Sequence, residues 1–153
     1  MLRFGILVSA VPLILAGLFA RGELLPGPKP CIESGGASLR IAETPWHADL
    51  HVAFTDVPQA ATVRVQIVDN VETADFVMVD DADGAEASVC GGAPRFVAIS
   101  AYPSAAAPVI YLSTEGEADY RIFVRSKTFS LREAAALIVG ANGGHARITA
   151  ASL

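Results

Sequence analysis

The chain has 153 residues, and the uninterrupted apolar stretch near its start restricts its fold and location more than any other feature. Residues 4–20 form a run of seventeen residues without a charge, with Arg3 before it and Arg21 after it. A membrane-spanning helix needs about 17–25 apolar residues, whereas the apolar core of a secretory signal has about 7–15. The stretch therefore predicts a single membrane-spanning helix or a signal segment, and either one exports the rest of the chain.

The flanking charges indicate how the chain would sit in a membrane. With positive charge retained on the inner side, Met1 stays in the cytoplasm and the C-terminal domain faces the periplasm or the cell exterior. A secreted protein, released by cleavage of the signal, is the alternative. The two possible cleavage sites, at residues 18–20 and 20–22, fit the small-x-small pattern poorly, because one has a bulky residue and the other an arginine.

Composition divides the chain into three parts: an anchor or signal segment over 1–21, a stalk over 22–38 and an exported domain over 39–153. The stalk is assigned from its prolines and glycines, which disfavour regular structure. Pro26, Pro28 and Pro30 alternate, which is typical of an extended spacer.

The two cysteines, Cys31 and Cys90, are too far apart in sequence for a C-x-x-C redox motif. In an exported domain two such cysteines usually pair. We therefore expect a structural disulfide, which would stabilise the domain by roughly 4 kcal/mol in the chain-entropy model.

The charge balance is mildly acidic, with 11 basic and 16 acidic residues and a net charge of −5. A nucleic-acid-binding protein needs a basic surface, so nucleic acid is not expected as a partner. The sequence contains no recognised nucleotide-binding, hydrolase or metalloprotease motif, so no cofactor is predicted and an enzyme is not the preferred interpretation.

The alternation of apolar and polar residues predicts strands over 50–54, 62–68, 75–80, 95–100, 108–113 and 119–126. The segments 75–80, 95–100 and 108–113 are apolar on both faces, which is typical of central strands. Only six residues separate 62–68 from 75–80, and a parallel crossover needs about 10–12. We therefore predict that these two strands form a hairpin, that the last two strands form another, and that the sheet is mainly antiparallel. No internal repeat is predicted.

A helix is predicted to begin at Ser130, where Ser130 and Glu133 form the S-x-x-E pattern of a capping box. Asn142, Gly143 and Gly144 should end it. The helix has no polar face after its first turn, so it should be well buried. The predicted fold is an α+β domain in which this single C-terminal helix packs across a mainly antiparallel sheet of five to six strands.

His47, Asp49 and His51 are the strongest candidates for metal ligands, since imidazole and carboxylate groups bind zinc and copper. On one strand, however, His47 and His51 would lie about 13 Å apart at a rise of ~3.3 Å per residue. The alternative is that the three residues form the polar face of an edge strand. The acidic segment 80–86 suggests calcium, but an EF-hand loop with Gly84 at its sixth position would have Val79 and Cys90 as end ligands.

Arg121, Arg125, Lys127 and Arg132 form the densest group of positive charge in the sequence. They could bind an anionic group or an acidic partner. Alternatively, they could be solvated charges that protect an edge strand from unwanted pairing.

Together these features predict a membrane-anchored extracytoplasmic domain that acts by binding. An accessory or interaction subunit of a membrane-associated complex fits this combination, with the membrane contacted through residues 4–20 and a membrane protein as partner. The alternative is a metal-binding protein or metal-dependent hydrolase that uses His47, Asp49 and His51.

Overall fold

The computed structural model describes residues 30–80 and 90–145. Eight strands in this part of the chain form one sheet with the order β1-β2-β6-β3-β7-β4-β8-β5. The strands are β1 (Ile32–Ser34), β2 (Ala37–Ile41), β3 (Leu50–Thr55), β4 (Val63–Ile67), β5 (Phe76–Val79), β6 (Arg95–Ser100), β7 (Val109–Ser113) and β8 (Tyr120–Arg125). Three short 3-10 helices, η1 (Pro45–His47), η2 (Pro58–Ala60) and η3 (Val71–Thr73), precede β3, β4 and β5, and one α-helix, α2 (Leu131–Ala141), follows β8.

Six of the eight strands, β3 to β8, lie where the sequence predicts them, whereas β1 and β2 were not predicted. The pairing of the strands differs from the prediction. Within residues 30–80 and 90–145, β1 and β2 are the one antiparallel pair, and the other six pairings are parallel. β4 pairs with β7 and β8 rather than with β5, and β8 pairs with β4 and β5 rather than with β7. The predicted hairpins and the mainly antiparallel sheet of five to six strands are therefore wrong. The prediction that 75–80 is a central strand is also wrong, because β5 lies at one edge of the sheet.

The register of the sheet explains how such short connections can join parallel strands. Val97 of β6 pairs with the last residue of β2, Ile41, and also with the first residue of β3, Leu50. From β2 to β5, each strand therefore starts level with the end of the strand that precedes it in the sequence. The chain needs only to step sideways over one intervening strand, a distance of about 10 Å, and makes no return along the sheet. Ile110 and Ile122 are shared between neighbouring strands in the same way.

Residues 45–79 contain three units of a 13-residue repeat, each made of a 3-10 helix followed by a strand. The expectation that the chain has no internal repeat is therefore wrong. The 3-10 helices begin at Pro45, Pro58 and Val71, and the strands that follow them begin at Leu50, Val63 and Phe76. An alanine ends each turn, at positions 48, 61 and 74. The three units therefore share one local structure although few of their side chains are identical.

Before β3, β4, β5 and β8, the preceding residue fixes the strand to a neighbour through two hydrogen bonds, an arrangement we call a strand-start clasp. Its backbone N–H donates to the carbonyl of a partner residue, and its side-chain oxygen accepts from the N–H of that same residue. The four clasps join Asp49 to Phe96, Thr62 to Val109, Asp75 to Arg121 and Asp119 to Arg64. The short polar side chains required at these positions are acceptors that compete well for backbone N–H groups.

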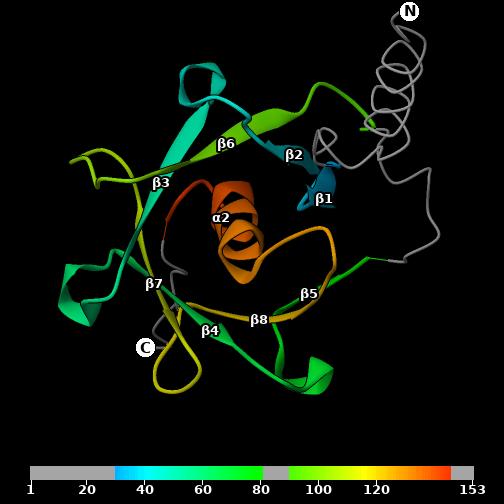
Figure 1. Cartoon of the computed structure of the whole chain (residues 1–153). Coiled ribbons are helices and arrows are strands. Elements are labelled where there is room, and N and C mark those ends of the chain that lie inside the picture. The colour runs from blue at the N-terminus through cyan, green and yellow to red at the C-terminus, as the bar shows by residue number, and fades with distance from the viewer. Residues whose placement is uncertain (1–29, 81–89, 146–153) are drawn as a thin grey trace, which may run out of the picture.

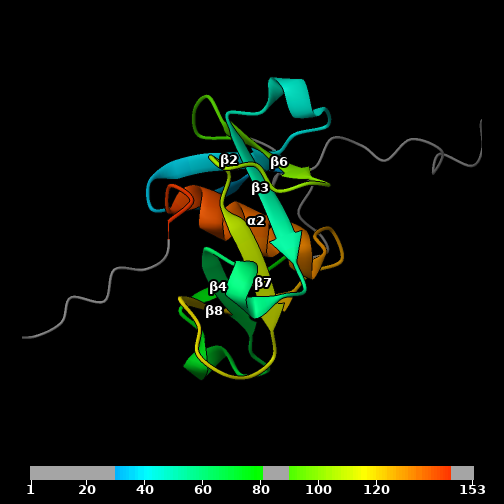
Figure 2. The same ribbon diagram turned by 90° about the vertical axis from the view of Figure 1, so that its left-hand side faces the viewer.

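The sheet curves around α2, which lies at the centre of the half-barrel in Figure 1. In the view turned by 90°, β3 and β7 cross in front of the helix (Figure 2). Seven consecutive helical residues, from Ala134 to Gly140, are buried. The prediction of a well-buried helix is confirmed, but the helix is enclosed rather than laid across a sheet. A flat sheet would cover one side only of a helix that is apolar on all sides, whereas a curved sheet covers most of its circumference.

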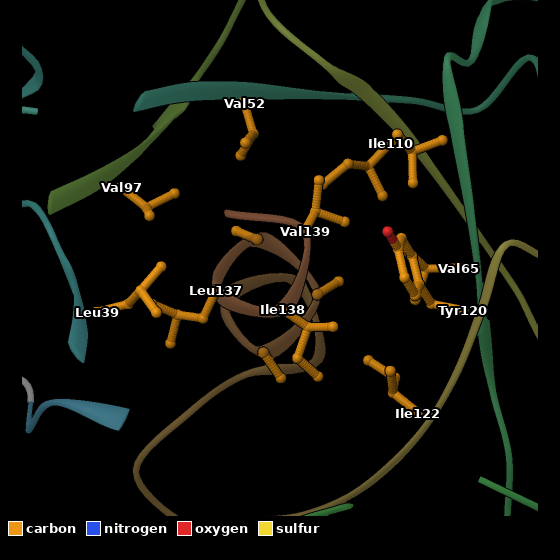
Figure 3. Packing of buried hydrophobic residues seen from close by; sticks show 14 of the residues in the cluster. Leu39, Val52, Val65, Val97, Ile110, Tyr120, Ile122, Leu137, Ile138 and Val139 are labelled. Atoms are coloured by element: carbon orange, nitrogen blue, oxygen red, sulfur yellow. The ribbon is translucent and has the colours of Figure 1, made fainter. Parts of the chain in front are cut away.

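The core lies between the inner face of the sheet and this helix. Side chains from β2, β3, β4, β6, β7 and β8 point toward α2 in Figure 3, among them Leu39, Val52, Val65, Val97, Ile110, Tyr120 and Ile122. Gly140 lets the sheet approach the helix closely, because a Cβ atom at this position would lie only 2.8 Å from Cγ2 of Val97.

Both predicted ends of the helix are confirmed. Ser130 accepts a hydrogen bond from the Glu133 amide, and the Glu133 carboxylate accepts from the Ser130 amide, which completes the capping box. At the other end Gly143 and Gly144 adopt positive φ values of 74° and 79°. The Gly144 amide then donates to the carbonyl of Val139, which ends the helix.

The predicted disulfide between Cys31 and Cys90 is present, with the two Cα atoms 5.8 Å apart. It joins the start of the β1–β2 hairpin to the segment that leads into β6. This hairpin covers residues 32–41, so folded structure begins inside the segment assigned to the stalk.

The predicted membrane-spanning or signal segment, 4–20, lies outside the described residues, as do residues 22–29 of the stalk and residues 81–86 of the acidic segment. Within 30–80 and 90–145, no helix is long and apolar enough to cross a membrane.

Candidate functional site

The structure does not bring His47, Asp49 and His51 together as one set of ligands. Pro45 starts a 3-10 turn that contains His47, so the three residues do not share a strand. His47 Nδ1 lies 2.8 Å from the Thr44 hydroxyl, and His51 Nε2 lies 2.9 Å from the carbonyl oxygen of Pro45. The Asp49 carboxylate accepts from the Phe96 amide at 2.7 Å in the first strand-start clasp.

These contacts give each candidate ligand a local structural partner. β3 lies inside the sheet, between β6 and β7, so the alternative of a polar edge strand does not describe it either. Across the two described segments, no three His, Cys, Asp or Glu side chains are close enough to hold one metal ion.

Asp80, the first residue of the acidic segment 80–86, closes the loop between β8 and α2. Its carboxylate accepts from the Ser126 hydroxyl at 2.8 Å and from the Lys127 and Thr128 amides at 3.0 and 2.9 Å. Hydrogen bonding by the Thr128 side chain, followed by that of Ser126 and by the two amides, holds the pKa of Asp80 far below its ordinary value of 3.8. Asp80 is therefore ionised at neutral pH and fixes the route of the chain into α2.

The basic group found in the sequence separates into two places. Arg121, Arg125 and Lys127 lie on β8 or directly after it, and all three are exposed. Arg132 instead lies over the ring of Phe54 on β3, with its guanidinium carbon 4.4 Å from the ring centroid. β3 is three places away from β8 in the sheet, so Arg132 belongs to a different region.

The outer face of β8 and β5 combines positive charge with exposed apolar side chains. Val77 pairs with Phe123, and Val79 pairs with Arg125. Val77 is 50% exposed and Val79 is 42% exposed, whereas Phe123 is half-buried. Arg121 lies beside this group and contacts Asp75, with its Nε 3.6 Å from Oδ2. We call the set Val77, Val79, Arg121, Phe123 and Arg125 the β5–β8 surface.

Sequence reasoning identified the cations of this surface but missed its apolar part. The segment 75–80 is apolar on both faces, and that pattern is typical of a strand with neighbours on both sides. The useful signal was the fit of 71–80 to the 13-residue repeat. As the last unit of the repeat, β5 has a neighbour on one side only among the described strands.

A second polar region lies at the start of β4 and β8. Ala61, Thr62, Arg64, Glu117, Ala118 and Asp119 line an open hollow of about 580 Å³. Thr62, Arg64 and Asp119 take part in strand-start clasps, so much of this polar lining belongs to the hydrogen bonding of the sheet itself.

Comparison of the chain with protein-family models, with curated proteins and with solved structures found no match. The fold and the β5–β8 surface therefore provide the basis for inferring function.

Proposed function

We propose that this chain is a membrane-anchored extracytoplasmic domain that binds a protein partner through the β5–β8 surface. Its role would be that of an accessory or interaction subunit of a membrane-associated complex. The apolar segment 4–20 supports the membrane location. The Cys31–Cys90 disulfide supports an oxidising compartment, because such bonds persist mainly outside the cytoplasm.

The observation that carries the proposal is the exposure of Val77 and Val79 next to Arg121 and Arg125. Neighbouring exposed apolar side chains are a common mark of an interaction site. Arginine is also enriched in protein interfaces, where it can form bidentate pairs with carboxylates. The surface therefore suits a partner that presents both apolar and acidic groups.

The test is to extract the tagged full chain from its native membrane with mild detergent and to quantify co-purifying proteins by mass spectrometry. Arg125→Glu should remove a stoichiometric partner, because it reverses the charge next to the exposed Val79, with which Arg125 pairs. Arg95→Glu is the matched control, since Arg95 is an exposed arginine at the start of β6. Equal recovery of the partner with both variants would contradict the proposal, as would recovery of the chain without a partner.

A further inference from the structure

The two edges of the sheet differ in how well they are protected. β1 is a strand of three residues that includes Glu33, and the disulfide joins the residue before it to Cys90. β5 contains four apolar residues and no proline, glycine or charge. Exposed edge strands usually carry charges, prolines or bulges that prevent further pairing. β5 lacks these features within the strand, which is typical of an edge that accepts another strand.

The 13-residue repeat shows where the backbone groups of β5 point. Arg64 and Val77 occupy equivalent positions, as do Ala53 and Val79. The Arg64 amide donates to Asp119, directly before β8, and the Ala53 amide donates to the Pro108 carbonyl, directly before β7. Both amides thus point to the neighbour that comes next in the sheet order. By this equivalence the Val77 and Val79 amides point away from β8, toward the edge of the sheet.

The way β8 joins β4 indicates what would fit beside β5. β8 runs parallel to β4, and Asp119 before it accepts from the Arg64 amide at 2.7 Å. A strand that joined β5 in the same manner would offer an aspartate to the Val77 amide. Its next residues would point alternately to the inner face, beside Phe76 and Met78, and to the outer face, on the side of Arg121 and Arg125. Apolar residues suit the first positions and acidic residues the second.

We propose that β5 binds an extended acidic segment of the partner protein as a ninth, parallel strand of the sheet. The segment would begin with aspartate and then alternate apolar and acidic residues. This inference rests on the proposed function and adds to it the mode of binding and the chemistry of the bound segment. Charge complementarity with Arg121, Arg125 and Lys127 favours an acidic occupant over a second copy of the chain, which would bring the same cations to the edge.

The first test uses a synthetic probe, acetyl-Asp-Val-Glu-Val-Glu-Val-amide, with the full chain in mild detergent. We expect saturable binding that weakens as salt is added. A peptide with lysine in place of its glutamates, and one with the residues in reverse order, should each bind at least about tenfold more weakly. Absence of binding by the acidic probe, or equal binding of all three peptides, would overturn the inference.

Amide hydrogen exchange measured by NMR tests the position of the added strand. The Val77 and Val79 amides should exchange rapidly in the free chain and slow at least about tenfold when the probe is bound, whereas Phe76 and Met78 should be protected in both states. Slow exchange of Val77 and Val79 before the probe is added would mean that the edge is already occupied, by the chain itself or by a second copy. That result would overturn the inference.

A proline substitution separates the inference from the proposed function. Val77→Pro removes the outward-pointing donor, and proline is tolerated on edge strands where its nitrogen faces outward. Val71→Pro is the matched control, because proline already occupies the equivalent positions 45 and 58. Loss of the native partner with Val77→Pro but not with Val71→Pro supports strand addition. If Arg125→Glu releases the partner and Val77→Pro does not, the proposed function stands and strand addition is wrong; if neither releases it, both are wrong.

Discussion

Replacing Asp119 by alanine tests the strand-start clasp, the feature that lets parallel strands follow one another after short connections. The Asp119 carboxylate accepts from the Arg64 amide at 2.7 Å, while the Asp119 amide donates to the Arg64 carbonyl at 2.9 Å. Alanine removes the first bond and keeps the second. A hydrogen bond to a charged group contributes about 1.5–3 kcal/mol, and partial exposure of Asp119 favours the lower end of this range. We therefore expect the free energy of unfolding to fall by about 1.5–2 kcal/mol.

The assay is equilibrium unfolding of the full chain by urea, in mild detergent and at constant pH. Glu115→Ala is the control, because Glu115 is an exposed acidic residue in the loop before β8, and it should change the free energy by no more than about 0.5 kcal/mol. Asp119→Asn keeps an acceptor oxygen and should lose less stability than Asp119→Ala. If Asp119→Ala and Glu115→Ala destabilise the chain equally, the clasp does not hold β8 to β4.

Three further predictions follow from the same structure. Val71→Pro should raise the free energy of unfolding by about 0.4–1 kcal/mol, because Asn70 before it is already extended and proline restricts the unfolded chain. A lower free energy of unfolding in urea would contradict the equivalence of the three turns. Because the folded-state pKa of Asp80 is lowered, its contribution to stability is present at neutral pH and is lost as the pH falls through 3.8 and below. Asp80→Asn should therefore make the free energy of unfolding less dependent on pH in the acid range, and an unchanged dependence would refute this. Replacing Cys31 and Cys90 together by serine should lower the free energy of unfolding by about 2–4 kcal/mol, measured without reductant, whereas an unaltered value would exclude a stabilising role for the bond.

Local features of the fold were predictable from the sequence, because their signals lie within a few residues. The capping box at Ser130 and Glu133 and the stop at Gly143 and Gly144 depend on such short-range chemistry. The positions of six strands followed from period-two alternation. The disulfide followed from the predicted compartment and from the presence of two cysteines.

The pairing of the strands was not predictable from connection length alone. The rule that short connections make hairpins assumes that a parallel connection must return along the whole strand. In this sheet Leu50 starts level with Ile41, so no return is needed. The 13-residue repeat was hidden because its units share turn geometry and clasp chemistry more than sequence: aspartate, threonine and aspartate fill the same position at 49, 62 and 75.

The candidate site was only partly predictable for the same reason. Arg121, Arg125 and Lys127 are close in sequence, so their proximity on β8 could be anticipated. Arg132 is also close in sequence, but the turn into α2 carries it to Phe54. Val77 and Val79 gain their importance from the position of β5 in the sheet order, which depends on long-range pairing.

Site-specific photo-crosslinking in intact cells tests the central claim, partner binding at the β5–β8 surface, most directly. A photoreactive amino acid would replace Val77 in one strain and Val57 in another, since both valines are about half exposed and Val57 lies beside η2, away from β5. We predict a discrete crosslinked product with one membrane-associated protein from position 77 and none from position 57. No product from position 77, or the same product from both positions, would contradict the claim.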